Sequence, residues 1–258
     1  MRHETEIAIK AVSAAIQIAD SREGADDVSS KGGIDLVTAT DIKNEDVIRN
    51  ILTDAFPDYS IVGEERGGSP SDDSPYWLVD PICGTRPYAS DVPLYCTNLA
   101  LVENGTVTTA AIALGKSGEI MYAEKGNGAR VRTGTEDQGI AVSDKSNTLW
   151  LGGRGQHAAN TVRNAMLEKR WYIWQFSSSI AYPYTAAGRV SGLVHFAAHL
   201  PMTPVHTAAG CFVTEEAGGI VTDTDGNTWD LKSTTFLLAA TEKLYDELRE
   251  IIEKSREL

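Results

Sequence analysis

Hydrophobic residues recur at mostly helical spacings over residues 4–20, where isoleucines, a valine and alanines alternate with glutamates, a lysine and a glutamine. This spacing predicts an amphipathic helix near the start of the chain. A second helix is predicted from about Asp41, with apolar positions facing inward until the Phe56-Pro57-Asp58 turn ends it. Residues 21–33 have little apolar content and three glycines, so they are predicted to form a loop.

Strand-like runs of β-branched and aromatic residues follow one another after Tyr76, separated by short turns. The dipeptide Asn104-Gly105 between two of these runs is a strong hairpin signal, and the region is predicted to form an antiparallel meander. After about Val142, strand-like and helix-like segments alternate and end in a helix predicted over residues 242–253. Such alternation is typical of α/β proteins.

The predicted fold class is therefore α/β in a layered α+β arrangement. We expect residues 1–141 to form an N-terminal α+β half with the antiparallel sheet, and residues 142–258 to form a C-terminal α/β half. A chain of 258 residues with 42% hydrophobic residues can fill a sizeable core. The two halves are expected to pack as one compact unit.

Acidic residues outnumber basic ones by 36 to 23, which gives a net charge of -13. This charge repels nucleic acids and anionic lipids, so a small molecule is the expected ligand. No run approaches the roughly 18 apolar residues of a membrane span, and the first residues lack the apolar segment of a signal peptide. Cys83, Cys96 and Cys211 show no paired spacing, which favours free thiols and a cytoplasmic location.

Three segments place polar side chains at the ends of apolar runs. Glu64 follows the run YSIV, and Asp80 ends the run WLV before the sequence PICGT. A carboxylate beside exposed backbone amides can hold a hard cation on one side and a phosphate on the other. His206, in HTAAG, lies at or just before a predicted helix start. Taken singly, these residues also fit a surface glutamate, an Asp-Pro turn and a capping histidine.

Together, in this order and spacing, the three segments resemble the inositol monophosphatase family. The resemblance extends from DLVTATD at Asp35 to EAGGIVTD at Asp223, and it includes the long middle stretch from Thr97 to Val131. It implies a sandwich of alternating α-β-α-β-α layers, hydrolysis of phosphate monoesters with Mg²⁺, and a homodimer. The leading hypothesis is a divergent hydrolase acting on a small phosphorylated sugar, polyol or nucleotide.

The resemblance implies roles for residues at matching positions. Glu64, Asp80 and the backbone carbonyl of Ile82 match the family's first metal site. Thr85 matches the threonine that helps orient the attacking water, and Asp41 matches an aspartate that helps arrange a further, weaker metal. One Mg²⁺ ion is therefore expected at the first site.

Substrate contacts are implied in the same way. The amides of Gly84 and Thr85 match the family's phosphate cradle. Arg86 stands where the family usually has a small polar residue; an arginine there would bind phosphate in a bidentate manner, or else point to solvent or pair with Asp91. His199 lies where the family places contacts to sugar hydroxyls. The usual acidic contact is absent, which argues against inositol phosphate itself.

The second metal site departs from the family's pattern. The family supplies three aspartates, whereas this chain has Asp80, Cys83 and His206, with Val205 in place of a tryptophan. Mg²⁺ prefers oxygen ligands, so it is expected to bind poorly there. In two-metal phosphoryl transfer the second ion stabilises the leaving oxygen. Losing an electrostatic stabiliser of this kind raises the barrier by on the order of 3 to 4 kcal/mol and slows the reaction roughly a hundredfold to a thousandfold.

Alternatives follow from the same two substitutions. Asp80, Cys83 and His206 would suit Zn²⁺ or another transition metal. In a second alternative, Cys83 is a nucleophile and His206 is its base, in a reaction other than phosphate hydrolysis. Nearby backbone amides would lower the pKa of the Cys83 thiol. A last alternative is a protein that binds a phosphorylated ligand and catalyses nothing.

Overall fold

The computed structural model describes residues 1–32, 35–70, 74–153, 155–176, 178–196 and 203–257. The helices within them are α1 (His3–Ser21), α2 (Ala39–Ala55), α3 (Thr85–Ala89), α4 (Gln156–Leu167), α5 (Ala181–Ala186), α6 (Pro204–Glu216) and α7 (Glu242–Arg256). The strands are β1 (Val28–Gly32), β2 (Asp35–Thr38), β3 (Ser60–Gly63), β4 (Tyr76–Cys83), β5 (Cys96–Glu103), β6 (Thr106–Leu114), β7 (Glu119–Glu124), β8 (Ala129–Thr133), β9 (Glu136–Ile140), β10 (Thr148–Gly152), β11 (Tyr172–Trp174), β12 (Gly192–His195), β13 (Ile220–Thr222) and β14 (Phe236–Ala239).

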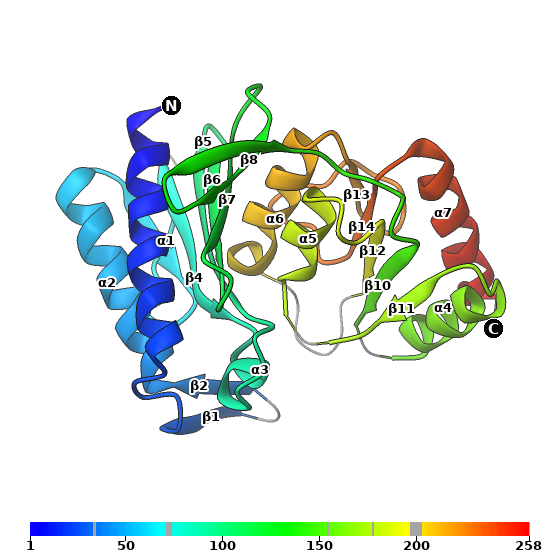
Figure 1. The fold of residues 1–258 in the computed structure, drawn as a ribbon, viewed down its shortest axis with the longest axis horizontal. Coiled ribbons are helices and arrows are strands. Elements are labelled where there is room, and N and C mark those ends of the chain that lie inside the picture. Colours follow the sequence, from blue (N-terminus) through cyan, green and yellow to red (C-terminus); the bar gives the residue numbers. More distant parts are fainter. Residues whose placement is uncertain (33–34, 71–73, 154, 177, 197–202, 258) are drawn as a thin grey trace.

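Helices and sheets alternate in layers across the molecule (Figure 1). The larger sheet has the strand order β3-β4-β5-β6-β7-β8-β9, and the smaller one the order β11-β10-β12-β14-β13. Helices α1 and α2 cover the outer face of the larger sheet, α5 and α6 lie between the sheets, and α4 and α7 cover the far face of the smaller sheet. This order of layers confirms the predicted layered fold.

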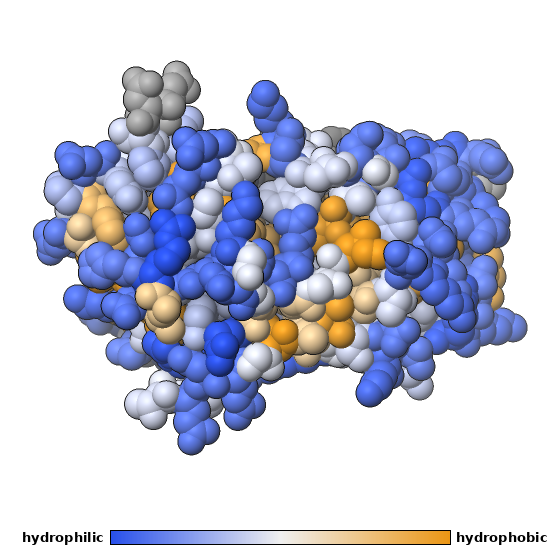
Figure 2. All heavy atoms as spheres, turned by 90° about the horizontal axis from the view of Figure 1, so that it is seen from above, coloured by the Kyte–Doolittle hydropathy of each residue, from blue (hydrophilic) through white to orange (hydrophobic). Residues whose placement is uncertain are grey.

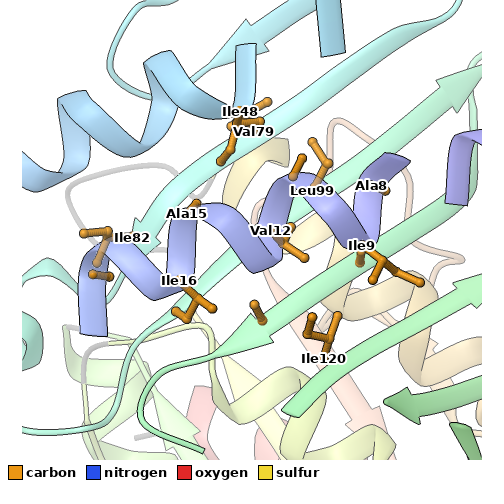
Figure 3. Close-up of a cluster of buried hydrophobic side chains, with 14 of the residues drawn as sticks. Ala8, Ile9, Val12, Ala15, Ile16, Ile48, Val79, Ile82, Leu99 and Ile120 are labelled. Carbon is orange, nitrogen blue, oxygen red and sulfur yellow. The ribbon is translucent and has the colours of Figure 1, made fainter. Parts of the chain in front are cut away.

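Helix α1 shows how the apolar pattern positions the first layer. Its residues Ala8, Val12 and Ala15 recur at helical spacing and are buried against the larger sheet, where they lie near Leu99 and Ile120 (Figure 3). Burying a side chain of the size of valine or leucine contributes about 1.5 to 3 kcal/mol. The predicted helix over residues 4–20 is thus confirmed. It covers the face of the larger sheet opposite the face that α6 contacts.

Helix α2 begins two residues before the predicted start, because Thr38 caps it. The Thr38 hydroxyl accepts from the Asp41 amide at 3.4 Å, and the Asp41 carboxylate accepts from the Thr38 amide at 2.9 Å. This reciprocal pair is a capping box, which satisfies two amides that the helix leaves without partners. Asp41 is thereby held at a fixed position in the first turn.

The segment predicted as a loop over residues 21–33 contains a strand. Strand β1 pairs antiparallel with β2, with Val28 opposite Thr38. Every residue of β1 is exposed, so the strand has no alternation of apolar and polar positions that would mark it in the sequence. Pairing with β2, rather than burial, makes this segment a strand.

The chain leaves the larger sheet after β9 and enters the smaller sheet at β10. Helix α6 comes from the C-terminal half, yet its residues Val205 and Phe212 share a core with Leu78 and Leu114 of the larger sheet. The halves therefore contribute to one hydrophobic core. The boundary at residue 142 stays a prediction.

Hydrophilic side chains cover most of the face seen in Figure 2, and hydrophobic ones gather near its middle. A largely hydrophilic face is expected for a chain with 36 acidic and 23 basic residues. Within the described part of the chain, no helix combines the length and apolar character needed to cross a bilayer.

Candidate metal centre

The three segments singled out by the sequence meet in space. Strands β3 and β4 are parallel, with Gly63 beside Val79, so Glu64 follows the end of β3 next to Asp80 in β4. His206 reaches them from the first turn of α6. One ligand atom from each of the three side chains lies within 4.8 Å of the other two. This is the kind of carboxylate and imidazole cluster that can hold a metal ion.

Asp80 is the most constrained member of this cluster. The residue is fully buried, and neither carboxylate oxygen has a hydrogen-bond partner among the described residues. Burial, together with the neighbouring Cys83 and Glu64, raises the pKa of Asp80 well above its usual range. Buried carboxylates are normally paired or bound to metal, so the surroundings of Asp80 fit a bound cation.

Glu64 faces two nitrogen groups. Its Oε1 atom accepts from the Lys31 ammonium at 2.9 Å and lies 3.7 Å from Nε2 of His206. Burial alone would raise the pKa of Glu64, but His206 and Lys31 lower it to about 2. Lys31 also donates to Glu65 at 2.5 Å, and burial raises the pKa of Glu65 to about 7. Lys31 therefore places a positive charge where a metal ion would meet Glu64.

Replacing Lys31 with methionine is expected to tighten divalent metal binding by on the order of tenfold. The ammonium competes for Glu64 and repels a dication a few ångströms away, and both effects disappear in Lys31→Met. Isothermal titration with Mn²⁺ measures the change. Lys43→Met is the matched control, because Lys43 pairs with Glu23 at a more exposed position. Weaker binding in Lys31→Met would mean that Lys31 holds the two glutamates in place.

Thr85 lies between Asp41 and the end of β4. Its Oγ1 atom is 3.2 Å from Oδ1 of Asp41 and 3.2 Å from the carbonyl oxygen of Ile82. The second oxygen of Asp41 accepts from Thr38, and burial raises the pKa of Asp41 to about 6. The helix start thus fixes a carboxylate that orients the Thr85 hydroxyl beside the cluster.

Gly84 links β4 to α3 with a φ of 97°, in the left-handed region that favours glycine. A Cβ atom there would lie 2.7 Å from the carbonyl oxygen of Leu94 and 2.8 Å from Oγ of Ser178. The backbone can therefore make this close turn only without a side chain. Arg86 follows on α3 and lines a cavity of about 370 Å³ together with Leu36 and Phe176.

The Cys83 thiol neighbours Asp80, but among the described residues it is not one of the clustered ligand atoms. Its sulfur accepts from the Ser179 amide at 3.2 Å, and Cys83 lies opposite Cys96 in the β4–β5 pair. The contact with Cys96 and burial raise the pKa of Cys83 well above its usual range. Among the described residues, the ligand cluster contains Glu64 where the sequence predicted Cys83. The expected set of Asp80, Cys83 and His206 stays a prediction, of which the cluster contains Asp80 and His206.

His206 is likewise engaged elsewhere than with Cys83. Its Nδ1 atom is 2.8 Å from the Thr203 hydroxyl, and its Nε2 atom faces Glu64. Covalent catalysis by Cys83 would need a hydrogen-bonded thiol and imidazole, and the described residues show no hydrogen bond between Cys83 and His206. The two ring nitrogens, either of which could act as a base, already lie next to Thr203 and Glu64.

Two further histidines, His195 and His199, lie in the segment before α6. His199, predicted to contact substrate, lies outside the described residues. His195 ends β12, and its Nδ1 atom is 3.1 Å from the Tyr182 hydroxyl. Burial lowers the pKa of His195 to about 4. His195 is therefore part of the core next to Trp150.

Sequence reasoning missed Glu45, which positions the turn that carries Glu64. Glu45 is fully buried on α2, and its carboxylate accepts from the amides of Glu65 at 2.7 Å and Arg66 at 3.1 Å. Its Oε1 atom would lie 1.9 Å from a Cβ atom at Gly63. The signal in the sequence was an acidic residue four positions after Asp41, on the stripe that continues at Ile48.

Two further contributors were also missed. Lys31 lies on the exposed strand β1, and Thr203 precedes α6. Neither residue could be recognised from hydrophobic periodicity or from its spacing to another polar residue. Each contacts a residue of the cluster only because of the tertiary fold.

Known proteins are similar to this chain in sequence and in fold. The profile of the Inositol monophosphatase family matches residues 1–257. An inositol-1-monophosphatase of Rhizobium meliloti is 32% identical over 238 residues, which cover 88% of this chain and 86% of the relative. A fructose-1,6-bisphosphatase/inositol-1-monophosphatase of Thermotoga maritima is 30% identical over 232 residues, with 88% and 86% covered. The solved structure of a Thermotoga maritima IMPase superposes with a TM-score of 0.86 at 28% identity, covering 99% of both chains. The chain belongs to the inositol monophosphatase family.

Proposed function

We propose that this protein is a divalent-cation-dependent hydrolase that removes phosphate from a small phosphorylated sugar, polyol or nucleotide. The observation that carries the proposal is Asp80, whose two buried oxygens have no hydrogen-bond partner among the described residues and which lies beside Glu64. Relatives similar over most of the chain are an inositol-1-monophosphatase and a fructose-1,6-bisphosphatase/inositol-1-monophosphatase, which support a phosphatase-type reaction. The natural substrate belongs to this broad class of phosphate monoesters.

Glu64, Asp80 and the carbonyl oxygen of Ile82 would hold the metal ion, with Mg²⁺ as the ion that the family resemblance implies. A bound dication supplies positive charge to the phosphate oxygens and lowers the pKa of a bound water. Glu64 and Asp80 together contribute two negative charges, which one dication neutralises. A dianionic phosphate can then approach a centre that no longer repels it.

Thr85 and Asp41 would orient the attacking water. When the Thr85 hydroxyl donates to Oδ1 of Asp41, its oxygen lone pairs are available to accept a proton from water. A proton leaving the water can pass to Oγ1 of Thr85 while the threonine proton passes to Asp41. Asp41 is suited to this role because the capping box at Thr38 fixes its carboxylate.

The phosphate group would be bound by the amides of Gly84 and Thr85 and by Arg86. The tight turn at Gly84 brings the backbone close to Ser178 and leaves no room for a side chain. An arginine forms bidentate hydrogen bonds with phosphate oxygens, so Arg86 would add charge where the family's second metal is weakened. His199 is proposed as a contact to the substrate's hydroxyl groups.

The second metal position is remodelled in this proposal. Cys83 and His206 replace two carboxylates, so a second Mg²⁺ would bind weakly, and hydrolysis would be slower than with both ions. The family resemblance further leads us to propose a cytoplasmic homodimer. Size-exclusion chromatography with light scattering tests the dimer.

Phosphate release from a panel of sugar, polyol and nucleotide monophosphates is the direct test. Turnover is expected with at least one divalent ion among Mg²⁺, Mn²⁺ and Zn²⁺ and is expected to vanish with chelator.

Thr85→Val should lower kcat far more than it changes metal binding, because it removes only the hydroxyl that orients water. Absence of release with every ion and substrate, from folded protein, would contradict the proposal.

A further inference from the structure

One ligand atom from each of Glu64, Asp80 and His206 lies within 4.8 Å of the other two, so the three side chains are placed to close on one metal ion. Two ligand atoms that are each about 2.1 Å from one ion can be at most about 4.2 Å apart. The Oε1 atom of Glu64 and the Nε2 atom of His206 are separated by 3.7 Å, which lies inside this limit. The three side chains come from the residue after β3, from β4 and from α6, so the fold itself brings them together.

Asp80 gives an independent indication of a cation at this point. It is fully buried, and its two oxygens have no hydrogen-bond partner among the described residues. A buried carboxylate without a partner is costly unless a charge compensates it. Asp80 lies within the same cluster of ligand atoms as His206.

The His206 ring is oriented for coordination through Nε2. Its Nδ1 atom is bound to the Thr203 hydroxyl at 2.8 Å, one turn earlier in the chain. Histidine ligands of metals usually have such a partner on the other ring nitrogen, which fixes the orientation of the ring. The remaining nitrogen is directed toward Glu64, on the side where the cluster forms.

The ligand atoms of the cluster, two carboxylate oxygens and one imidazole nitrogen, determine which metal ions it can bind well. An imidazole nitrogen suits Zn²⁺, Fe²⁺, Co²⁺ and similar ions, whereas Mg²⁺ prefers oxygen ligands. Three protein ligands with an open position are typical of catalytic zinc sites. We propose that Glu64, Asp80 and His206 are the protein ligands of a first-row transition-metal dication, and that His206 selects such an ion over Mg²⁺. This inference deepens the proposed function and rests on it for the reaction, although binding can be measured alone.

Metal binding without substrate tests the inference. Protein freed of metal with chelator is titrated with Co²⁺, Zn²⁺ and Mg²⁺ under equilibrium dialysis, and the Co²⁺ form is followed by visible absorption. One equivalent of Co²⁺ or Zn²⁺ should bind more tightly than Mg²⁺. His206→Asp should weaken Co²⁺ binding by on the order of a hundredfold and leave Mg²⁺ binding no weaker. The exposed His157→Asp is the matched control.

Two further variants separate the ligand from its neighbours. Thr203→Val should weaken Co²⁺ binding about tenfold to a hundredfold while keeping one equivalent, as loss of a supporting contact does. Cys83→Ser should leave the Co²⁺ spectrum unchanged, because a coordinated thiolate would add an intense near-ultraviolet band that is not expected here. Thermal unfolding with and without Co²⁺ checks that each variant folds.

The outcomes separate this inference from the proposed function. Unchanged Co²⁺ affinity in His206→Asp, loss of the Co²⁺ spectrum in Cys83→Ser, or tighter binding of Mg²⁺ than of Co²⁺ would overturn the inference. Phosphate release supported by Mg²⁺ would then still support the hydrolase. Conversely, one equivalent of tightly bound Co²⁺ without release of phosphate from any substrate would uphold the metal site and overturn the proposed function.

Discussion

The double variant Cys83→Asp/His206→Asp is expected to gain magnesium-dependent phosphate release by on the order of a hundredfold. Carboxylates at both positions, together with Asp80, would supply the three oxygen ligands that Mg²⁺ prefers at the second metal position. The Ser179 amide, which now donates to the Cys83 sulfur, can donate to a carboxylate placed there. The gain should appear in kcat with Mg²⁺, and any activity with Zn²⁺ should fall because the imidazole is lost.

Each single variant should give much less than the double variant, because one new carboxylate leaves the second position incomplete. His157→Asp in the wild-type background adds the same charge at an exposed place and should change nothing. The double variant should also unfold at lower temperature in chelator, since a carboxylate at position 83 repels Asp80, and Mg²⁺ should restore stability. Recovery of stability by Mg²⁺ without a gain in turnover would show that the remaining pocket no longer supports hydrolysis.

Asp80→Asn is expected to reduce phosphate release at least a thousandfold and yet to stabilise the metal-free protein by about 1 to 3 kcal/mol. The loss of activity follows from removing a metal ligand at the centre of the cluster. The stabilisation follows because the wild-type carboxylate is buried and has no hydrogen-bond partner in the described part of the chain. Urea unfolding in chelator, beside phosphate release with metal, measures both effects on the same preparation.

The stabilising effect of Asp80→Asn should depend on pH. The folded protein holds the pKa of Asp80 well above its usual range, so the wild type loses stability as pH rises above the pKa of the unfolded chain. The advantage of the variant should therefore be small near pH 4 and grow with increasing pH. Asp54→Asn, at an exposed position of α2, serves as the control. A variant less stable than the wild type at pH 7 would mean that the Asp80 carboxylate has a stabilising partner without metal.

Local patterns predicted most of the fold. The periodic apolar residues of α1 and the alternating strands of the meander carry their own signals, and the Asn104-Gly105 turn has both φ angles positive, as a tight hairpin requires. Strand β1 carries no such signal, because all of its residues are exposed. Its pairing with β2, and with it the position of Lys31, depends on tertiary structure.

The candidate centre was predicted in part for the same reason. Glu64 and Asp80 each end or follow a strand-like run, but only the family resemblance placed them in one metal site. The direction of Cys83 could not be predicted, since the register of β4 against β5 shifts between Asp80 and Cys83. The thiol accepts from the Ser179 amide and neighbours both Cys96 and Asp80, while His206 approaches Glu64 from a helix distant in sequence.

Asp41 and Glu45 lie one turn apart on the buried face of α2, and each receives hydrogen bonds from a different part of the centre. Both carboxylates also stabilise the fold, since one caps the helix and the other binds two backbone amides. Selection for folding alone would therefore preserve them in a descendant that had lost its reaction. Asp80 is the opposite case, because its buried charge is a liability without a ligand. In evolutionary terms, the retention of Asp80 is a better record of continuing function than the retention of Asp41 or Glu45.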